Sequence, residues 1–292
     1  MILYVAGSDP TSGERAPRGI LLVRLQEILG RTRLAATYLI GRQRMEKGVT
    51  SHDDDTWIVS YPKSGNTWTR FLIGNLISGG KPVDWSNIER WVPDIYYGRD
   101  SQFRSLPRPR YFKSHEAYRP NYRRVVLIVR DPRDVAVSYY HFARKAGHLD
   151  VDATMEDFMK LFISGRIDPY GSWGENVGSW LGARRGSPDF TVVRYEDLLE
   201  NTEAELSRIV EMLGLNVGSD QLRRAVANST ADKMRALEDT QRNQHKALKN
   251  SRTDIAFVRA AKAGQWQYAL PPECAQQIEA AWKPSMCELG YL

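Results

Sequence analysis

The chain has 292 residues, of which 42% are hydrophobic and 26% charged, and its formal net charge is +6. This composition is typical of a globular protein with a large buried core. Two cysteines exclude a disulfide framework or a cysteine-rich zinc module, and no apolar run reaches the length of a membrane-spanning helix. The positive charge fits a polyanionic ligand, a membrane surface or a nucleic acid, and does not choose among them.

Residues 1–56 are expected to form a basic N-terminal extension with a helix between Ile20 and about Met45. Residues 1–50 hold eight basic and four acidic side chains, and leucines recur there at helical spacing. Such a helix can contact an anionic membrane peripherally, cover a site, or pack on the domain with its basic face in water. The first residues lack the charged leader and the apolar length of a signal peptide, so we expect a cytoplasmic protein.

From residue 57 onward, short apolar runs alternate with segments of helical periodicity. Strands are expected at 57–61, 110–114, 125–130 and 190–195. Helices are expected at 67–78, 133–144, 154–164, 173–184, 197–213, 219–227 and 272–287. This alternation predicts one α/β domain over residues 57–292, with a central parallel sheet flanked by helices. The polar stretch 239–262 is expected to form a long loop or loose helix over a site.

The turn after the first strand carries the strongest functional signal. It reads Tyr-Pro-Lys-Ser-Gly-Asn-Thr-Trp over residues 61–68 and leads into a helix. Free backbone N–H groups at a helix start bind an anion, and Lys63 adds a positive charge beside them. The turn is not a Walker A loop, because Gly-x-x-x-x-Gly-Lys-Ser/Thr is absent. Taken alone, it fits a phosphate-binding loop or a structural turn.

A second strand-to-helix corner follows the apolar strand at 125–130. Asp131 and Pro132 suit the N-cap and first turn of a helix. Arg130 at the strand tip and Ser138 in the helix would together bind a phosphate monoester. Open α/β sheets bind ligands at the carboxyl ends of their strands. A capped helix with a surface arginine would give the same pattern.

The sequence Lys113-Ser114-His115 ends another predicted strand. Histidine is a candidate general base, because its ordinary pKa of about 6.5 suits proton transfer near neutrality. A lone histidine is more often structural, but Lys113 and the position between two phosphate-binding corners favour catalysis. The five histidines and two cysteines are scattered along the chain, so we expect no metal site.

Together these motifs resemble those of the cytosolic-type sulfotransferases that use 3′-phosphoadenosine 5′-phosphosulfate (PAPS). The resemblance covers about residues 57–268. It rests on six stretches in the same order and at similar spacing, namely residues 61–68, 113–115, 130–138, 170–173, 195–198 and 257–266. It implies a single-domain fold like that of P-loop kinases, with PAPS as co-substrate, 3′-phosphoadenosine 5′-phosphate (PAP) as product and no metal. The implied partner is a small-molecule hydroxyl acceptor and no nucleic acid.

The resemblance also implies a role for each matching residue. His115 takes the proton from the acceptor hydroxyl, Lys113 steadies the sulfuryl oxygens, and Lys63 reaches the oxygen that bridges phosphate and sulfate. Trp68 stacks on adenine, and Arg259 closes over the 3′-phosphate. The implied donor-binding set is Lys63, Ser64, Gly65, Asn66, Thr67, Trp68, Arg130, Ser138, Tyr195, Ser229 and Arg259. Positioning and charge stabilisation carry most of the catalysis in the related phosphoryl transfer, which agrees with these roles.

The chain departs from the family pattern at two places. Arg259-Ala260-Ala261 stands where the family has Arg-Lys-Gly, so Lys262 or Arg252 would have to replace the missing cation. Asn66 stands where the family usually has threonine. A catalytically idle nucleotide-binding or scaffold protein is the alternative, although such a protein has no need of His115. A nucleotide kinase is a further alternative, but the sequence lacks its Walker loop and clear Mg²⁺ carboxylates.

The acceptor pocket is expected from segments 81–108, 141–152 and 239–256. The first of these is rich in aromatic residues, namely Trp85, Trp91, Tyr96, Tyr97 and Phe103. Such a pocket suits a phenol, a lipid or polyketide-like alcohol, or a sugar, and a packed surface loop would have the same composition. The dimerisation segment of animal members is not recognisable, so the sequence does not define the oligomeric state.

Overall fold

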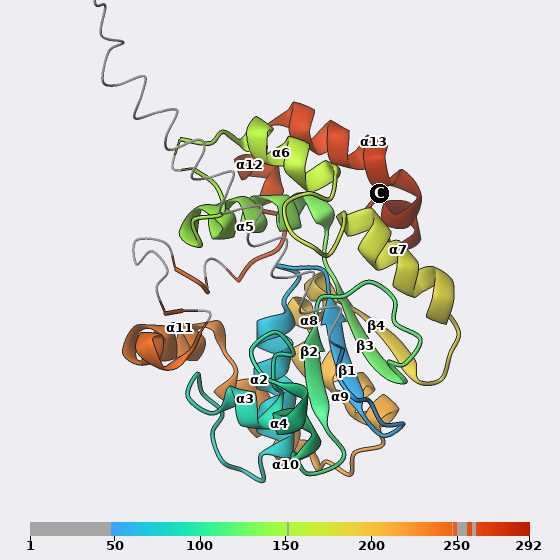
Figure 1. Ribbon diagram of the computed structural model, residues 1–292, viewed down its shortest axis with the longest axis vertical. Coiled ribbons are helices and arrows are strands. Elements are labelled where there is room, and N and C mark those ends of the chain that lie inside the picture. Colours follow the sequence, from blue (N-terminus) through green and yellow to red (C-terminus); the bar gives the residue numbers. More distant parts are fainter. Residues whose placement is uncertain (1–47, 151, 247, 250–255, 259–260) are drawn as a thin grey trace, which may run out of the picture.

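A four-stranded parallel sheet lies at the centre of the protein (Figure 1). The computed structural model describes residues 48–150, 152–246, 248–249, 256–258 and 261–292. The strand order is β2-β1-β3-β4. The strands are β1 (Thr56–Ser60), β2 (Tyr111–Ser114), β3 (Arg124–Val129) and β4 (Phe190–Arg194). The predicted α/β fold with a central parallel sheet is therefore confirmed.

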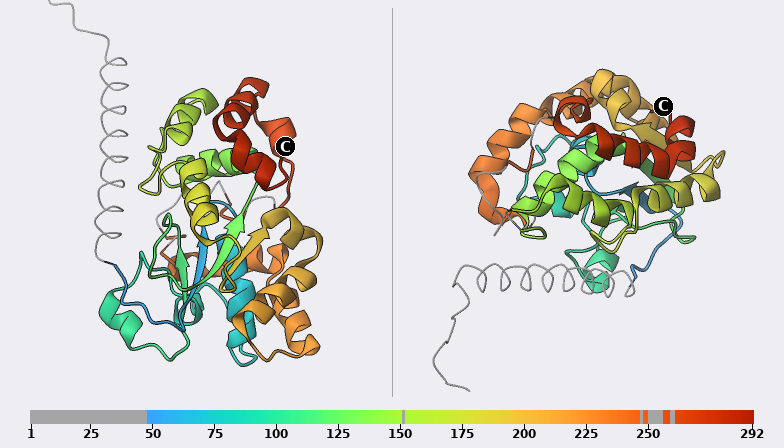
Figure 2. Two further views of the ribbon diagram at one scale, coloured as in Figure 1. Left: turned by 90° about the vertical axis from the view of Figure 1, so that its right-hand side faces the viewer. Right: turned by 90° about the horizontal axis from the view of Figure 1, so that it is seen from above.

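Helices cover both faces of this sheet. They are α2 (Asn66–Ile77), α3 (Ile88–Trp91), α4 (Asp100–Arg104), α5 (Pro132–Lys145), α6 (Met155–Ile163), α7 (Trp173–Arg184), α8 (Tyr195–Glu200), α9 (Thr202–Leu213), α10 (Ser219–Asn228), α11 (Ala231–Gln241), α12 (Trp266–Ala269) and α13 (Pro272–Glu288). Figure 2 shows α13 packed near α6 and α7, and α10 beside α2 and α9, and these helices make direct contacts.

Successive residues of a strand pack into two hydrophobic cores, one on each face of the sheet. Trp57 and Val59 of β1 pack with residues of α5, α6, α7 and α13, whereas Ile58 packs with residues of α2, α9 and α10. All five residues of β1 are buried. A parallel strand covered on both faces needs apolar residues at nearly every position, which explains the continuous apolar runs of the sequence.

The predicted corners are formed as expected at the ends of the strands. Asp131 caps α5 by accepting a hydrogen bond from the backbone N–H of Arg133, and Pro132 is the first residue of the helix. Ser172 and Glu175 form a capping box at the start of α7. These local signals fix where each helix begins, and so they fix which side chains face the ends of the strands.

The sequence prediction was wrong in one helix and missed several short ones. The predicted helix 197–213 is two helices, α8 and α9, because Asn201 has non-helical backbone angles and its side chain caps α9. Helices α3 and α4 lie in the segment 81–108, where the sequence predicted no helix. Helix α11 begins before the polar stretch 239–262 and ends within it, and a 3₁₀ turn (Arg242–Gln244) follows there. Short helices of this kind depend on tertiary packing more than on propensity.

The N-terminal extension lies largely outside the described residues. The predicted helix between Ile20 and about Met45, and its contact with a membrane, therefore stay predictions, as does the domain boundary at residue 57. Within the described part of the chain, no helix combines the length and apolar character that crossing a bilayer requires.

Candidate active site

The first corner of the site is the turn between β1 and α2, and its geometry requires Gly65. Gly65 has a φ of +101°, and a Cβ atom there would lie 2.5 Å from Cδ2 of Tyr195. Asn66 crosses the end of β1, donating hydrogen bonds to the carbonyl of Ile58 (3.0 Å) and the hydroxyl of Ser60 (3.2 Å). The Asn66 amide thus links the start of α2 to the end of β1 across the turn.

The start of α2 is suited to an anion. No side chain caps it among the described residues, and its first backbone N–H groups point out of the helix end. The Ser64 hydroxyl is buried and has no hydrogen-bond partner in the described part of the chain. Thr67 lines the adjoining cavity. Lys63 Nζ lies 4.4 Å from the ring centroid of Phe142 and 4.8 Å from that of Phe257, at cation–π distance.

Arg130 joins the two corners of the site. Its guanidinium donates to the backbone carbonyls of Lys63 (3.2 Å) and Lys262 (3.1 Å) and lies 4.4 Å above the ring centroid of Tyr195. Its Nε has no partner among the described residues. Ser138, in the second turn of α5, lines the same cavity. Arg130 is only 7% exposed, and its Nε remains a donor that no described residue uses.

Trp68, Tyr195 and Ser229 come together from three helices or their ends. Trp68 Nε1 donates to the backbone carbonyl of Ser229 (2.9 Å), and its ring meets Tyr195 edge-on at 5.9 Å between centroids. The Ser229 hydroxyl donates to the carbonyl of Ala225 and faces the interior. Trp68 and Tyr195 line the cavity, and Thr230 takes the lining position next to Ser229. Arg259 lies outside the described residues.

His115 is held in one tautomer. Its Nδ1 lies 2.7 Å from the backbone carbonyl of Ser60, which can only accept, so Nδ1 carries the proton and Nε2 keeps its lone pair. Its backbone N–H donates to the hydroxyl of Tyr96 (2.9 Å). Burial lowers the pKa of His115 well below its ordinary value, and the charge of Lys113 lowers the pKa further. The imidazole is thus neutral at pH 7, with its free lone pair on Nε2.

Lys113 forms an ion pair that the sequence analysis missed. Its Nζ lies 2.6 Å from Oδ2 of Asp94, and both side chains are nearly buried. Burial lowers the pKa of Lys113, whereas the neighbouring Asp94 carboxylate opposes that shift. Asp94 lies in the segment 81–108, where only the aromatic residues drew attention. An isolated Asp-Ile after a proline carries no signal that would have found it.

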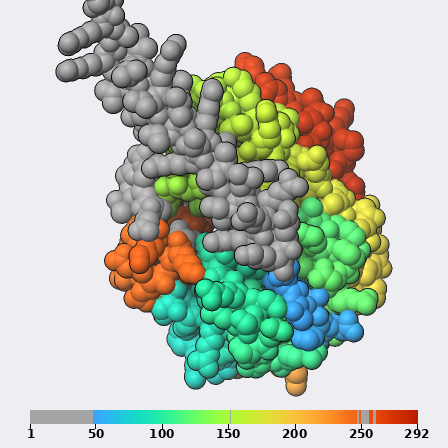
Figure 3. All heavy atoms as spheres, viewed as in Figure 1, coloured from blue at the N-terminus to red at the C-terminus, as the bar shows by residue number. Residues whose placement is uncertain are grey.

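One cavity of about 710 Å³ connects these groups. All three predicted acceptor segments contribute to its wall, through Trp85, Tyr96, Tyr97, Phe142, His148 and His245. Trp91 and Phe103 do not line it. Figure 3 shows α11 beside the segment that follows α2, where Gln241 bonds to the backbone N–H of Trp85 (2.9 Å) and to Asp84 (3.0 Å). Lys63, Lys113, His115 and Arg130 all line this cavity.

Within the described residues, no three His, Cys, Asp or Glu side chains gather closely enough to hold a metal ion. The charged and imidazole side chains on the cavity wall are three lysines, two arginines, three histidines and two aspartates, so basic groups outnumber acidic ones. Such a set binds and stabilises an anion.

The chain is similar to sulfotransferases over most of its length. The family model for the sulfotransferase domain matches residues 53–290. Sulfotransferase 2B1 from Homo sapiens is 30% identical over 247 residues, which cover 80% of this chain and 66% of that protein. Cytosolic sulfotransferase 12 from Arabidopsis thaliana is 27% identical, in an alignment of 305 positions that covers 94% of this chain and 92% of that protein.

Solved structures share the fold. Retinol dehydratase in complex with androsterone and PAP aligns with a TM-score of 0.67 at 21% identity, covering 80% of this chain and 81% of that one. A mouse sulfotransferase complexed with PAP also gives 0.67, at 23% identity, covering 82% and 86%. The matched range 53–290 contains all four strands and every residue described above as lining the cavity. The chain therefore belongs to the sulfotransferase family, in its cytosolic type.

Proposed function

We propose that this protein transfers the sulfuryl group of PAPS to a hydroxyl of a small-molecule acceptor, releasing PAP. The observation that carries this proposal is the convergence of Lys63, Lys113 and a neutral His115 on one cavity that opens at the uncapped start of α2. The PAP complexes of the two solved relatives support the same donor.

The donor would bind along the two corners. The start of α2, with the Ser64 and Thr67 hydroxyls, suits the 5′-phosphosulfate, and the unused donor of Arg130 with Ser138 suits the 3′-phosphate. Trp68 and Tyr195 supply ring surfaces for adenine. Arg259 would add a second cation at the 3′-phosphate.

The chemistry is an in-line displacement at sulfur. The acceptor oxygen attacks sulfur while His115 Nε2 takes its proton, and the bond between sulfur and the bridging oxygen breaks. The electron pair of that bond leaves on the phosphate of PAP, where Lys63 neutralises the growing negative charge. Lys113 would stabilise the sulfuryl oxygens during the transfer. No hydride, electron or water is needed, so the reaction balances with donor and acceptor alone.

The acceptor we propose is a largely apolar alcohol or phenol. Aromatic side chains from three segments line the cavity on the side of His115, including Tyr96 and Tyr170. Relatives of the same fold were solved with androsterone and with retinol, which are apolar alcohols. The name of the Arabidopsis relative supports a cytoplasmic reaction.

Calorimetric titration with PAP, with ADP as the control ligand and without Mg²⁺, tests the donor site. We expect PAP to bind at least tenfold more tightly than ADP, because one charge-assisted contact contributes about 1.5–3 kcal/mol. Equal binding of the two ligands would remove the assignment of Arg130 and Ser138. If neither ligand binds, the donor site is not functional, and the idle-scaffold alternative takes precedence.

A further inference from the structure

The segment 93–96 behaves as a short extra strand along β2, the edge strand of the sheet. The backbone N–H of Lys113 donates to the carbonyl of Pro93 (2.9 Å), and that of Ile95 donates to the carbonyl of Lys113 (3.3 Å). Asp94 and Lys113 form a parallel bridge. Direct partners in such a pair place their side chains next to one another.

Both catalytic candidates are contacted from this segment. Oδ2 of Asp94 accepts from Lys113 Nζ at 2.6 Å, and Oδ1 accepts from the backbone N–H of Tyr96 at 3.0 Å. The Tyr96 hydroxyl in turn accepts from the backbone N–H of His115. Asp94 is 1% exposed and lines the cavity. An ion pair with a buried carboxylate restricts the position of a lysine ammonium on its flexible four-carbon stem.

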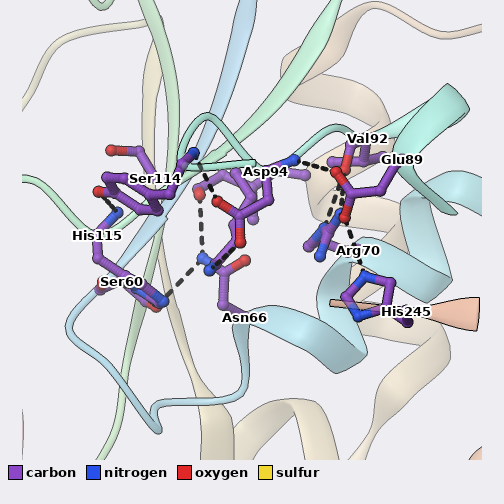
Figure 4. A network of polar contacts seen from close by, with 12 residues as sticks. Ser60, Asn66, Arg70, Glu89, Val92, Asp94, Ser114, His115 and His245 are labelled. Atoms are coloured by element: carbon purple, nitrogen blue, oxygen red, sulfur yellow. Dashed lines mark hydrogen bonds and ion pairs between the residues drawn. The ribbon is translucent and has the colours of Figure 1, made fainter. Parts of the chain in front are cut away.

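A second carboxylate holds Asp94 in place. Oε2 of Glu89 accepts from the backbone N–H of Asp94 (2.7 Å), and Oε1 lies 2.7 Å from Arg70 Nη2 and 3.0 Å from His245 Nε2 (Figure 4). Burial raises the pKa of Glu89, but the Arg70 charge and the His245 hydrogen bond outweigh burial and bring the pKa to about 2. Glu89 is therefore ionised throughout the working pH range.

We propose that Asp94 is a positioning residue for the transfer reaction, which holds the Lys113 ammonium at the cavity wall beside His115. Glu89 fixes the backbone of Asp94 and ties it to Arg70 and His245. This inference rests on the proposed function. In this proposal the Asp94 carboxylate does not contact the reacting atoms. It acts on the reaction through Lys113.

The charges around the pair define what the removal of Asp94 would do. The charges of Asp94, Glu89 and Arg70 affect the pKa of Lys113. The charges of Lys113, Lys63 and Arg70 affect the pKa of His115. Without the Asp94 carboxylate, the buried ammonium would lose its direct counter-charge, so the pKa of Lys113 would fall further. The ammonium would also be free to leave the position beside His115.

Lysine acetylation of the full chain tests the contact without donor or acceptor. Lys113 acetylation by acetic anhydride is followed by mass spectrometry as a function of pH. We expect Asp94→Asn to make Lys113 react at lower pH than in the wild type. Asp157→Asn is the matched control, because Asp157 pairs with Lys160 at 3.1 Å on the exposed surface. An unchanged Lys113 profile in Asp94→Asn would overturn the proposal.

Kinetics with PAPS and 2-naphthol test the consequence. We expect Asp94→Asn to lower kcat about 10- to 100-fold, because misplacing a catalytic group by about 1 Å costs on this order. PAP affinity by calorimetry should stay within about threefold, since the donor corners are untouched. Asp94→Glu, which keeps the charge, should recover part of the rate.

A kcat within twofold of wild type in Asp94→Asn would refute the positioning role. So would a parallel loss of PAP affinity and of cooperative unfolding in both Asp94 variants, which would make Asp94 a residue of general stability. If the wild type neither binds PAP nor forms sulfated product, the proposed function fails instead, while the acetylation profile still decides whether Asp94 holds Lys113.

Discussion

The cavity has two sides that are built in different ways. The corner side consists of residues 61–68 and 130–138, where each strand turns directly into a helix. The wall side consists of residues 85–97, 113–115, 168–170 and 241–246, which meet only through the tertiary fold. Each corner is formed within a few residues of sequence, and the two corners then meet where Arg130 donates to the carbonyl of Lys63 across 67 positions. On the wall side, Trp85 bonds to Gln241 across 156 positions.

This difference implies different sensitivities to mutation. In the proposed function, the corner residues bind the charged groups of the donor, so changes there should alter donor affinity. The wall residues would orient the hydroxyl acceptor and His115, so changes there should alter turnover while the donor still binds. Substitutions on each side can therefore separate binding from chemistry.

Replacement of His115 should have the largest effect, and it lies on the wall side. His115→Ala removes the neutral imidazole, and a general base contributes about 100- to 10,000-fold. We expect kcat to fall by that factor while PAP affinity by calorimetry is unchanged. His52→Ala, a histidine away from the cavity wall, is the control. If His115→Ala keeps most of its activity, another group takes the proton.

Replacement of Arg130 should act on the corner side alone. Arg130→Ala should weaken PAP binding by about 1.5–3 kcal/mol, because a charge-assisted contact to the 3′-phosphate is lost. The same variant should bind adenosine 5′-phosphosulfate, which lacks the 3′-phosphate, almost as the wild type does. Equal losses for the two ligands would mean that Arg130 shapes the loop at Lys63 rather than binding the phosphate.

Gly65→Ala tests the close approach of Tyr195 to the first corner. The positive φ alone costs about 1–3 kcal/mol, and the added Cβ would meet the Tyr195 ring at 2.5 Å. Gly79→Ala has a similar backbone strain, with φ at +64° and open space around the Cβ. We expect both variants to lower the melting temperature and only Gly65→Ala to lower PAP affinity. Identical PAP affinities would leave the turn without a role at the donor.

The smallest expected effect concerns a buried carboxyl on the wall side. Burial raises the pKa of Asp168 to about 7, against hydrogen bonds from the Tyr139 hydroxyl and the Tyr170 backbone N–H. The folded state thus holds the proton more tightly than the unfolded chain does. The contribution of Asp168 to the free energy of unfolding therefore decreases as pH rises from about 4 to 7.

Asp168→Asn removes this titration while keeping the shape of the side chain. Its melting temperature relative to wild type should therefore rise between pH 4 and pH 7 and stay constant above pH 7. Scanning calorimetry of both proteins across this range measures the difference. A constant gap at all pH values would show that Asp168 keeps an ordinary pKa in the folded protein.

The same contrast explains how much the sequence could predict. The corners were predicted because Asp131-Pro132 and the turn at 61–65 combine strand ends, caps and glycine within a few residues. The contacts of Asp94 with Lys113 and of Glu89 with Arg70 and His245 could not be predicted, because the partners lie on different elements. Helix α11 was missed for the same reason, since its Glu238 is fixed by the backbone N–H groups of Phe257 and Val258.

Transfer of labelled sulfate from PAPS tests the central claim most directly. The full chain is incubated without metal with a phenol, a steroid alcohol or retinol, and the products are separated by chromatography. The proposed function predicts a sulfated product from at least one acceptor, formed at least 100-fold more slowly by His115→Ala. PAP binding without a sulfated product from any acceptor would contradict the claim and identify the protein as a nucleotide-binding relative without sulfotransferase activity.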